Sequence, residues 1–190
     1  MMRIITGTAR GTHLYTLQGD ATRPTSERTK EALFSMLGDA VRGTRVLDLF
    51  AGSGQLGLEA LSRGAERAVF VDGSAAAVDI VRRNAEKTHL FSKARVLSSE
   101  ATAYLRSCGE GPFDLVFLDP PYAAGLLPRC LSLLLSRGLL SPDAVLAVES
   151  GSPDAVFEGD TALASQFEIK KQNRYGIAWV TVLTLKENQV

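Results

Sequence analysis

The chain contains few of the residues that build metal centres or covalent crosslinks. Its 190 residues include two cysteines and two histidines. Cys108 and Cys130 lack the short spacing of metal-binding cysteine pairs, and two cysteines are too few for a disulfide framework. His13 and His89 are isolated in the sequence. We therefore expect no metal site, and we interpret the thiols as buried or incidental.

Long apolar runs are also missing. No run approaches the roughly 18 residues that a membrane helix needs, and residues 1–11 lack the apolar core of a secretion signal. Hydrophobic residues make up 45% of the chain and charged residues 22%, which is ordinary for one compact domain of this length. These features predict a cytoplasmic protein without a membrane partner.

An excess of positive charge, the usual mark of a nucleic-acid-binding protein, is absent overall because 21 basic residues balance 21 acidic ones. The distribution is uneven, however, and residues 1–30 carry five basic residues against two acidic ones. The five are Arg3, Arg10, Arg23, Arg28 and Lys30. This basic end could contact phosphates, or it could be a solvated surface that flanks a helix.

The most informative motif is FDLVFLDPPY, which ends at Tyr122. The apolar residues 115–118 predict a buried strand, and open α/β sheets bind ligands at the carboxyl ends of such strands. Pro120 and Pro121 lack an N–H and restrict the turn, so nearby carbonyls are held as acceptors, while Tyr122 offers a ring for stacking. Together with the Asp119 carboxylate they suit a planar substrate that carries an amine. The alternative is a proline turn with a capping aspartate.

A glycine-rich loop precedes this motif. The apolar residues 46–50 lead into Gly52, Gly54 and Gly57, which satisfy G-x-G-x-x-G, and a helical pattern follows. Such glycines let the backbone approach a nucleotide at a helix N-terminus. The match alone is a weak signal.

Two aspartates narrow the choice of nucleotide. Asp72 ends the next apolar run, twenty residues after Gly52, where a carboxylate can accept both hydroxyls of a ribose. NAD and S-adenosylmethionine both carry such a ribose. Asp48 lies within the strand before the loop, where an NAD site needs no acid but a cationic amino-acid ligand would favour one. S-adenosylmethionine carries a sulfonium and an ammonium group.

The coarse pattern alternates strands and helices. Strands are predicted at residues 45–50, 68–72, 94–97, 113–118 and 144–149, and helices between them at 55–63, 74–88, 101–107 and 126–137. A short β ribbon (3–6 with 13–17), a turn at 18–21 and a helix that begins after Thr25 or Ser26 and ends before Gly38 come first. A loop with a short helix over 150–164 and a β hairpin (166–172 with 178–185) come last. This predicts a doubly wound α/β sheet with an antiparallel C-terminal edge.

The motifs together resemble those of a known family. The segments RIITGTARG, TRPTSERTKEALFSML, DLFAGSGQLGLEALSRGA, FVD and FDLVFLDPPY are similar to those of the bacterial 16S rRNA guanine-N2 methyltransferases of the guanine 966 type. The resemblance covers nearly the whole chain. It implies a class I methyltransferase (Rossmann-like) fold, S-adenosylmethionine as donor, and a guanine N2 amine of 16S rRNA as acceptor, in a 30S subunit or an assembly intermediate.

Site residues follow from the same resemblance. Donor binding is implied for Asp48, Phe50, Ala51, Gly52, Gly54, Asp72, Gly73, Ser74, Glu100 and Ala101. Catalysis on the target base is implied for Asp119, Pro120, Pro121 and Tyr122. Residues 1–38 are expected to form an RNA-contacting extension that uses Arg3, Arg10, Arg23, Arg28 and Lys30, and residues 39–190 a methyltransferase domain, in a monomer.

Other functions remain open. An NAD-dependent oxidoreductase would explain the glycines and Asp72 but would leave Asp48 and the DPPY motif without a role. A noncatalytic RNA-binding module would keep the basic end without needing the donor. Among methyltransferases, enzymes that act on DNA adenine or protein glutamine are the main alternatives, because those amines also suit an acceptor-rich proline turn.

Overall fold

The computed structural model describes residues 2–17, 27–121 and 125–186, and these form a seven-stranded sheet of order β3-β2-β1-β4-β5-β7-β6. The strands are β1 (Arg45–Asp48), β2 (Arg67–Asp72), β3 (Ala94–Ser98), β4 (Phe113–Leu118), β5 (Leu140–Ser150), β6 (Phe167–Tyr175) and β7 (Ala178–Leu185). The first five are parallel, and β7 runs antiparallel between β5 and β6. The predicted doubly wound sheet with a C-terminal hairpin is confirmed.

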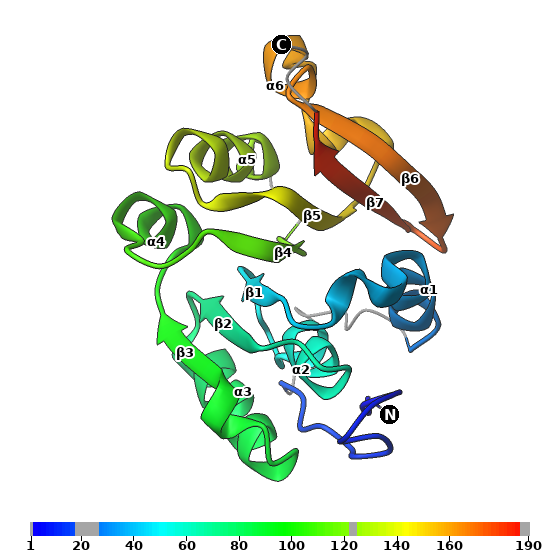
Figure 1. The fold of residues 1–190 in the computed structure, drawn as a ribbon, viewed down its shortest axis with the longest axis vertical. Helices are drawn as coiled ribbons and strands as arrows, with labels where there is room; N and C mark the ends of the chain where they lie inside the picture. The colour runs from blue at the N-terminus through cyan, green and yellow to red at the C-terminus, as the bar shows by residue number, and fades with distance from the viewer. Residues whose placement is uncertain (1, 18–26, 122–124, 187–190) are drawn as a thin grey trace.

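Helices cover both faces of the sheet (Figure 1). They are α1 (Glu27–Leu37), α2 (Gln55–Ser62), α3 (Ala75–Lys87), α4 (Ala101–Ser107), α5 (Leu126–Ser136) and α6 (Thr161–Ala164), with short 3-10 turns at Gly38–Val41, Phe91–Lys93 and Pro153–Val156. Helices α1, α2 and α3 share one apolar cluster with the sheet, and α4, α5 and α6 share the other. The short helix expected within 150–164 is therefore present as α6.

The strands alternate between these two clusters, as a buried parallel strand must. Leu115 and Phe117 of β4 face the first cluster, and Val116 and Leu118 face the second. Helix α1 contributes Leu33, Phe34 and Leu37, whose spacing places them on one face. The Phe34 ring lies 5.8 Å from that of Phe117, which packs α1 against β4.

The N-terminal segment forms a shortened version of the predicted ribbon. Arg3 and His13 make an antiparallel bridge, and the Ile4 amide donates to the Thr12 carbonyl at 3.0 Å. The amides of Ile5 and Thr6 donate instead to the Glu59 side chain of α2, at 2.8 and 3.0 Å. Backbone donors that a side chain satisfies cannot extend a strand pair, which explains why the pairing is shorter than predicted.

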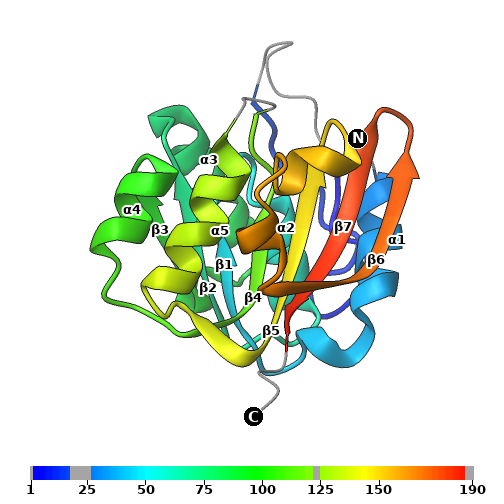
Figure 2. The ribbon, with the colours of Figure 1, turned by 90° about the horizontal axis from the view of Figure 1, so that it is seen from above.

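The same segment belongs to the main core. Met2, Ile4, Ala9 and Leu14 are buried in the cluster that contains α1 and α2. Residues 2–17 therefore pack on the sheet domain and have no core of their own. Figure 1 shows this segment beside α2, and Figure 2 shows the sheet covered by the helices from another direction.

Candidate active site

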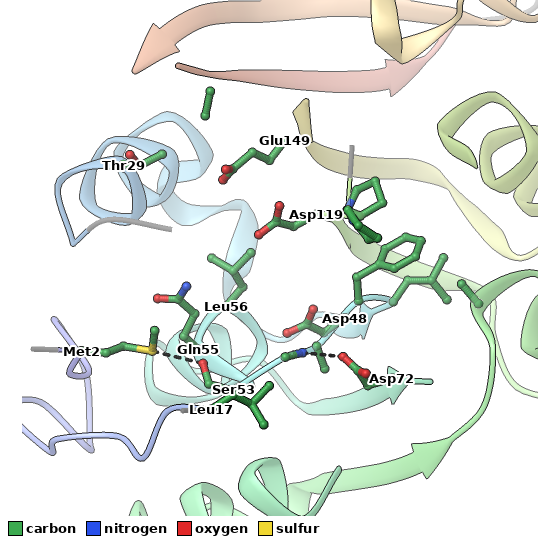
Figure 3. Close-up of a pocket in the computed structure, with 18 of the residues that line it drawn as sticks. Met2, Leu17, Thr29, Asp48, Ser53, Gln55, Leu56, Asp72, Asp119 and Glu149 are labelled. Atoms are coloured by element: carbon green, nitrogen blue, oxygen red, sulfur yellow. Dashed lines mark hydrogen bonds between the residues drawn. The ribbon is translucent and has the colours of Figure 1, made fainter. Parts of the chain in front are cut away.

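A cavity of about 1290 Å³ opens at the carboxyl ends of β1, β2, β4 and β5 (Figure 3). The carboxyl ends of parallel strands are where open α/β sheets bind ligands. Predicted donor and acceptor residues meet here: Asp48, Phe50, Ala51, Gly52, Asp72, Gly73, Glu100, Ala101, Asp119, Pro120 and Pro121 all line the cavity. The structure thus brings together two motifs that lie about 70 residues apart in the sequence.

The loop after β1 needs its glycines for different reasons. Gly52 and Gly54 have φ of 54° and 76°, a region that side chains rarely adopt, and the Gly54 amide closes the turn on the Ala51 carbonyl at 2.6 Å. Gly57 lies inside α2, where a Cβ would stand 2.3 Å from the Phe70 ring. The first two glycines shape the loop, and the third lets α2 pack closely on β2.

The loop is braced from two sides. The Asn84 amide of α3 donates to the carbonyls of Ser53 and Tyr15, at 2.8 and 3.0 Å, and its oxygen accepts from the Tyr15 amide at 2.7 Å. The Ser53 hydroxyl donates to the Met2 sulfur at 3.1 Å. Because Met2 also lines the cavity, the N-terminal segment forms part of its wall.

Asp72 ends β2 and holds the loop directly. Its carboxylate accepts from the amides of Gly52 and Ser74, both at 2.8 Å. A carboxylate has about four acceptor positions, so these bonds leave capacity for hydroxyls of a ligand. Gly73 lines the cavity, whereas the Ser74 side chain caps α3 by accepting from Ala77.

Asp48 is the buried acid of the site. Its side chain accepts from the Gly57 amide at 3.0 Å, and the residue is only 2% exposed. Burial raises the pKa of Asp48 to about 7, and the carboxylates of Asp119 and Asp72 add to the effect, against the opposing Gly57 hydrogen bond. A cation bound in the cavity would relieve this destabilised charge.

Glu100 lines the cavity at the start of helix α4. Its carboxylate accepts from the Thr102 hydroxyl at 2.8 Å and from the Ala103 amide at 3.0 Å, which lowers the pKa of Glu100. The residue therefore caps α4 while it faces the cavity with Ala101.

The acceptor side contains residues that the sequence did not single out. Asp119, Pro120 and Pro121 follow β4 as expected, and Tyr122 lies outside the described residues. Glu149 of β5, Thr29 of α1 and the hairpin residues 174–178 complete this side. The signal for Glu149 was its place at the end of an apolar run, the pattern that identified Asp119.

Gln55, the first residue of α2, adds a buried carboxamide to the site. The residue is 7% exposed and lines the cavity, and its side-chain oxygen makes no hydrogen bond within residues 2–17, 27–121 and 125–186. Buried polar atoms are normally satisfied, so this carboxamide fits a site that a polar ligand completes.

The basic residues assigned to RNA take different positions. Arg10 is exposed, Arg3 is half-exposed beside Glu27 at 3.4 Å, and Arg28 lines the cavity. Arg23 lies outside the described residues. The assignment of Lys30 was wrong: its side chain is fully buried, donates to the Arg3 carbonyl at 2.6 Å and pairs with Glu59 at 3.5 Å. The buried Lys30 side chain can therefore contact neither a phosphate nor solvent.

The described residues support neither a metal site nor a membrane-spanning helix. The described residues contain no cluster of three or more histidine, cysteine, aspartate or glutamate side chains that could hold a metal ion. None of the described helices is long and apolar enough to cross a membrane.

Comparison with known proteins gives concordant matches. The model of the family described as Conserved hypothetical protein 95 matches residues 2–184. The chain is 40% identical to ribosomal RNA small subunit methyltransferase D of Escherichia coli K12 over 149 residues, 78% of this chain and 74% of that one. It is 37% identical to the protein of the same name from Haemophilus influenzae over 151 residues, 78% of each chain.

A solved structure agrees with these relatives. A protein of Escherichia coli described as a candidate methyltransferase shares 32% identity and a TM-score of 0.84, covering 97% of this chain and 98% of its own. The fold is that of the class I methyltransferases.

Proposed function

Because this chain belongs to the family described as Conserved hypothetical protein 95, and shares most of its length with small-subunit rRNA methyltransferases, we propose that it methylates the N2 amine of a guanine in 16S rRNA. It is an rRNA methyltransferase that uses S-adenosylmethionine. The N2 position, a 30S particle or assembly intermediate as substrate, and a monomeric enzyme are parts of the proposal. One observation carries it: the Asp119 turn and the buried Asp48 open onto the same cavity.

The residues of the donor side fit S-adenosylmethionine. Asp48 offers a buried negative charge to a cationic ligand, and Asp72 offers acceptors to ribose hydroxyls. The Gly52 side of the loop is open, since a Cβ there would meet nothing within 4 Å. When bound, the donor supplies a methyl group on a sulfonium, which is already an activated leaving group.

The acceptor side suits an exocyclic amine. The lone pair of a guanine N2 amine is delocalised into the ring, so the amine is a poor nucleophile. The Asp119 carboxylate and the Pro120 carbonyl can accept its two hydrogens and favour a pyramidal nitrogen, with Asp119 able to take the departing proton. Positioning then supplies most of the rate, and well-oriented reactants contribute roughly 7–11 kcal/mol.

The N-terminal extension, residues 1–38, is the proposed RNA contact. Arg3 and Arg10 have exposed surface there, and Arg28 would lie near the acceptor base because it lines the cavity. An RNA base that is paired must be unstacked to enter, at a cost of a few kcal/mol. Deleting residues 1–24 would remove the buried side chains of Ile4 and Leu14, so substitution of single arginines is the cleaner way to probe this contact.

The test is transfer of a labelled methyl group to unmodified 30S particles or 16S rRNA, followed by nucleoside mass spectrometry. We expect N2-methylguanosine. Asp119→Ala should lower turnover by at least about 10²-fold, as loss of a group acting in proton transfer does, while donor binding is kept. Asp143→Ala, at an exposed position of β5, is the matched control. Normal turnover of Asp119→Ala would contradict its role, and donor binding without methyl transfer to the RNA would return the acceptor to the alternatives, DNA adenine or protein glutamine.

A further inference from the structure

Glu149 occupies on β5 the position that Asp119 occupies on β4. The two strands are parallel, and Leu118 pairs with Val148, so Asp119 and Glu149 each follow one residue later at the same edge of the sheet. Both residues line the cavity. Figure 3 shows their carboxylates directed into the same hollow. Two carboxylates from neighbouring strands, both hydrogen-bond acceptors, therefore face the part of the cavity that is proposed for the target base.

A pair of acceptors distinguishes guanine from the other amine-bearing bases. The Watson–Crick edge of guanine presents two adjacent donors, the N2 amine and N1–H, followed by the O6 acceptor. Adenine and cytosine present an amine beside an unprotonated ring nitrogen, which is an acceptor. An ionised carboxylate can only accept, so it pairs with N1–H of guanine and repels the ring nitrogen of the other two.

The next groups along the cavity are donors. Thr29 lies beyond Glu149 in Figure 3, and Arg28 lines the same cavity from the same helix. A threonine hydroxyl and a guanidinium can both donate to a carbonyl oxygen. The order of acceptor, acceptor and donor around the cavity complements the order of N2 amine, N1–H and O6.

We propose that Glu149 is a specificity-determining residue that accepts N1–H of the target guanine while Asp119 engages the N2 amine. This inference rests on the proposed function and names the atom that selects the base. It assigns discrimination to Glu149 and methyl transfer to the Asp119 turn. An analogue that keeps the amine but lacks N1–H should then be rejected because of residue 149.

The experiment replaces the target guanosine, once it is mapped, with 2-aminopurine riboside in the smallest RNA or particle that the wild type methylates. This base keeps the amine but carries an unprotonated N1. The wild type should prefer guanosine in kcat/KM by at least about 10²-fold, because an analogue that cannot make a buried hydrogen bond is strongly rejected. Glu149→Gln should methylate guanosine more slowly, and its preference should narrow at least about tenfold, since a carboxamide can donate to N1.

A glutamate outside the cavity provides the control. Glu168 of β6 is exposed and pairs with Lys170 at 2.6 Å, so Glu168→Gln should keep the wild-type preference. If Glu149→Gln slows both substrates equally, residue 149 only supports the structure and the inference is overturned. If the wild type makes no N2-methylguanosine, the proposed function fails first, and the inference with it.

Discussion

Two carboxylates are buried at helix α2, Glu59 within the helix and Asp48 at the end of the neighbouring strand β1, and the protein surrounds them differently. Glu59 accepts from the amides of Ile5 and Thr6 and from Arg63 at 2.8 Å, and it pairs with Lys30. Asp48 accepts from an amide of α2 and is paired with no lysine or arginine among the described residues. The Glu59 charge is neutralised within the fold, and the Asp48 charge is available to a ligand.

The difference separates a structural acid from a binding acid. Burial lowers the pKa of Lys30, although Glu59 acts in the opposite direction, so the pair depends on both members. Burial, together with the neighbouring acids, raises the pKa of Asp48 to about 7, whereas a bound cation would lower it. A buried charge without a counter-charge is unfavourable until something binds, which makes it a marker of function.

The largest effect is expected on stability, when the structural acid Glu59 is substituted. Glu59→Gln leaves Lys30 buried without a counter-charge, and removing one partner of a buried pair costs about 3–5 kcal/mol of unfolding free energy. Urea denaturation measures this loss. The exposed Glu66→Gln should change stability by less than about 0.5 kcal/mol.

The same experiment has an internal check. The double variant Glu59→Gln with Lys30→Met removes both charges and should recover part of the loss, since an apolar replacement of a buried pair is often tolerated. A loss below about 1 kcal/mol for Glu59→Gln alone would show that water or rearrangement compensates Lys30.

A smaller effect is expected on ligand affinity, when the binding acid Asp48 is substituted. Asp48→Asn keeps an acceptor for the Gly57 amide but removes the charge, so affinity for S-adenosylmethionine should fall by about 2–3 kcal/mol, roughly 30–150-fold. Isothermal titration calorimetry measures it. Stability of the unliganded protein should be unchanged or higher, because a buried charge is lost. At a temperature where it is folded, Glu59→Gln should have lower stability but unchanged affinity for S-adenosylmethionine. An equal loss of affinity in both variants would contradict the distinction between a structural and a binding acid.

The smallest effect concerns pH and tests Asp48 directly. The raised pKa means that unliganded Asp48 holds a proton below pH 7, and a cationic donor prefers the ionised form, so binding releases that proton. Affinity should rise with pH through this pKa, by up to about tenfold, or 1.4 kcal/mol, per unit below it. The ratio of wild-type to Asp48→Asn affinity cancels the titration of the ligand and should grow about tenfold from pH 6 to pH 8. A constant ratio would show that Asp48 is already ionised.

The part of the cavity wall at β1 and β2 could be predicted because its signals are local. Asp48, the glycines and Asp72 each follow directly from an apolar strand, and the parallel order of β1 and β2 brings them together. The acceptor motif was recognisable for the same reason. The fold follows from the alternation of strands and helices, and the structure confirms it.

The remaining features depend on which strands and helices lie side by side, which a local pattern alone does not decide. Glu149 becomes part of the site only because β5 lies beside β4. The hairpin reaches the cavity because β7 pairs with β5. Lys30 looked like a surface residue because its partner, Glu59, lies on another helix, and the same carboxylate took the amides that were expected to form a ribbon.

The order of the sheet also bears on how the chain avoids aggregation. β7 follows β6 in sequence, yet it lies between β5 and β6 and pairs with both. A chain without residues 178–185 would have an open edge on β5 beside the cavity, and its β6 would have no neighbour in the sheet. Such edges recruit other strands and promote aggregation. Residues 178–185 therefore protect two strands at once, and a chain that lacks them is expected to aggregate.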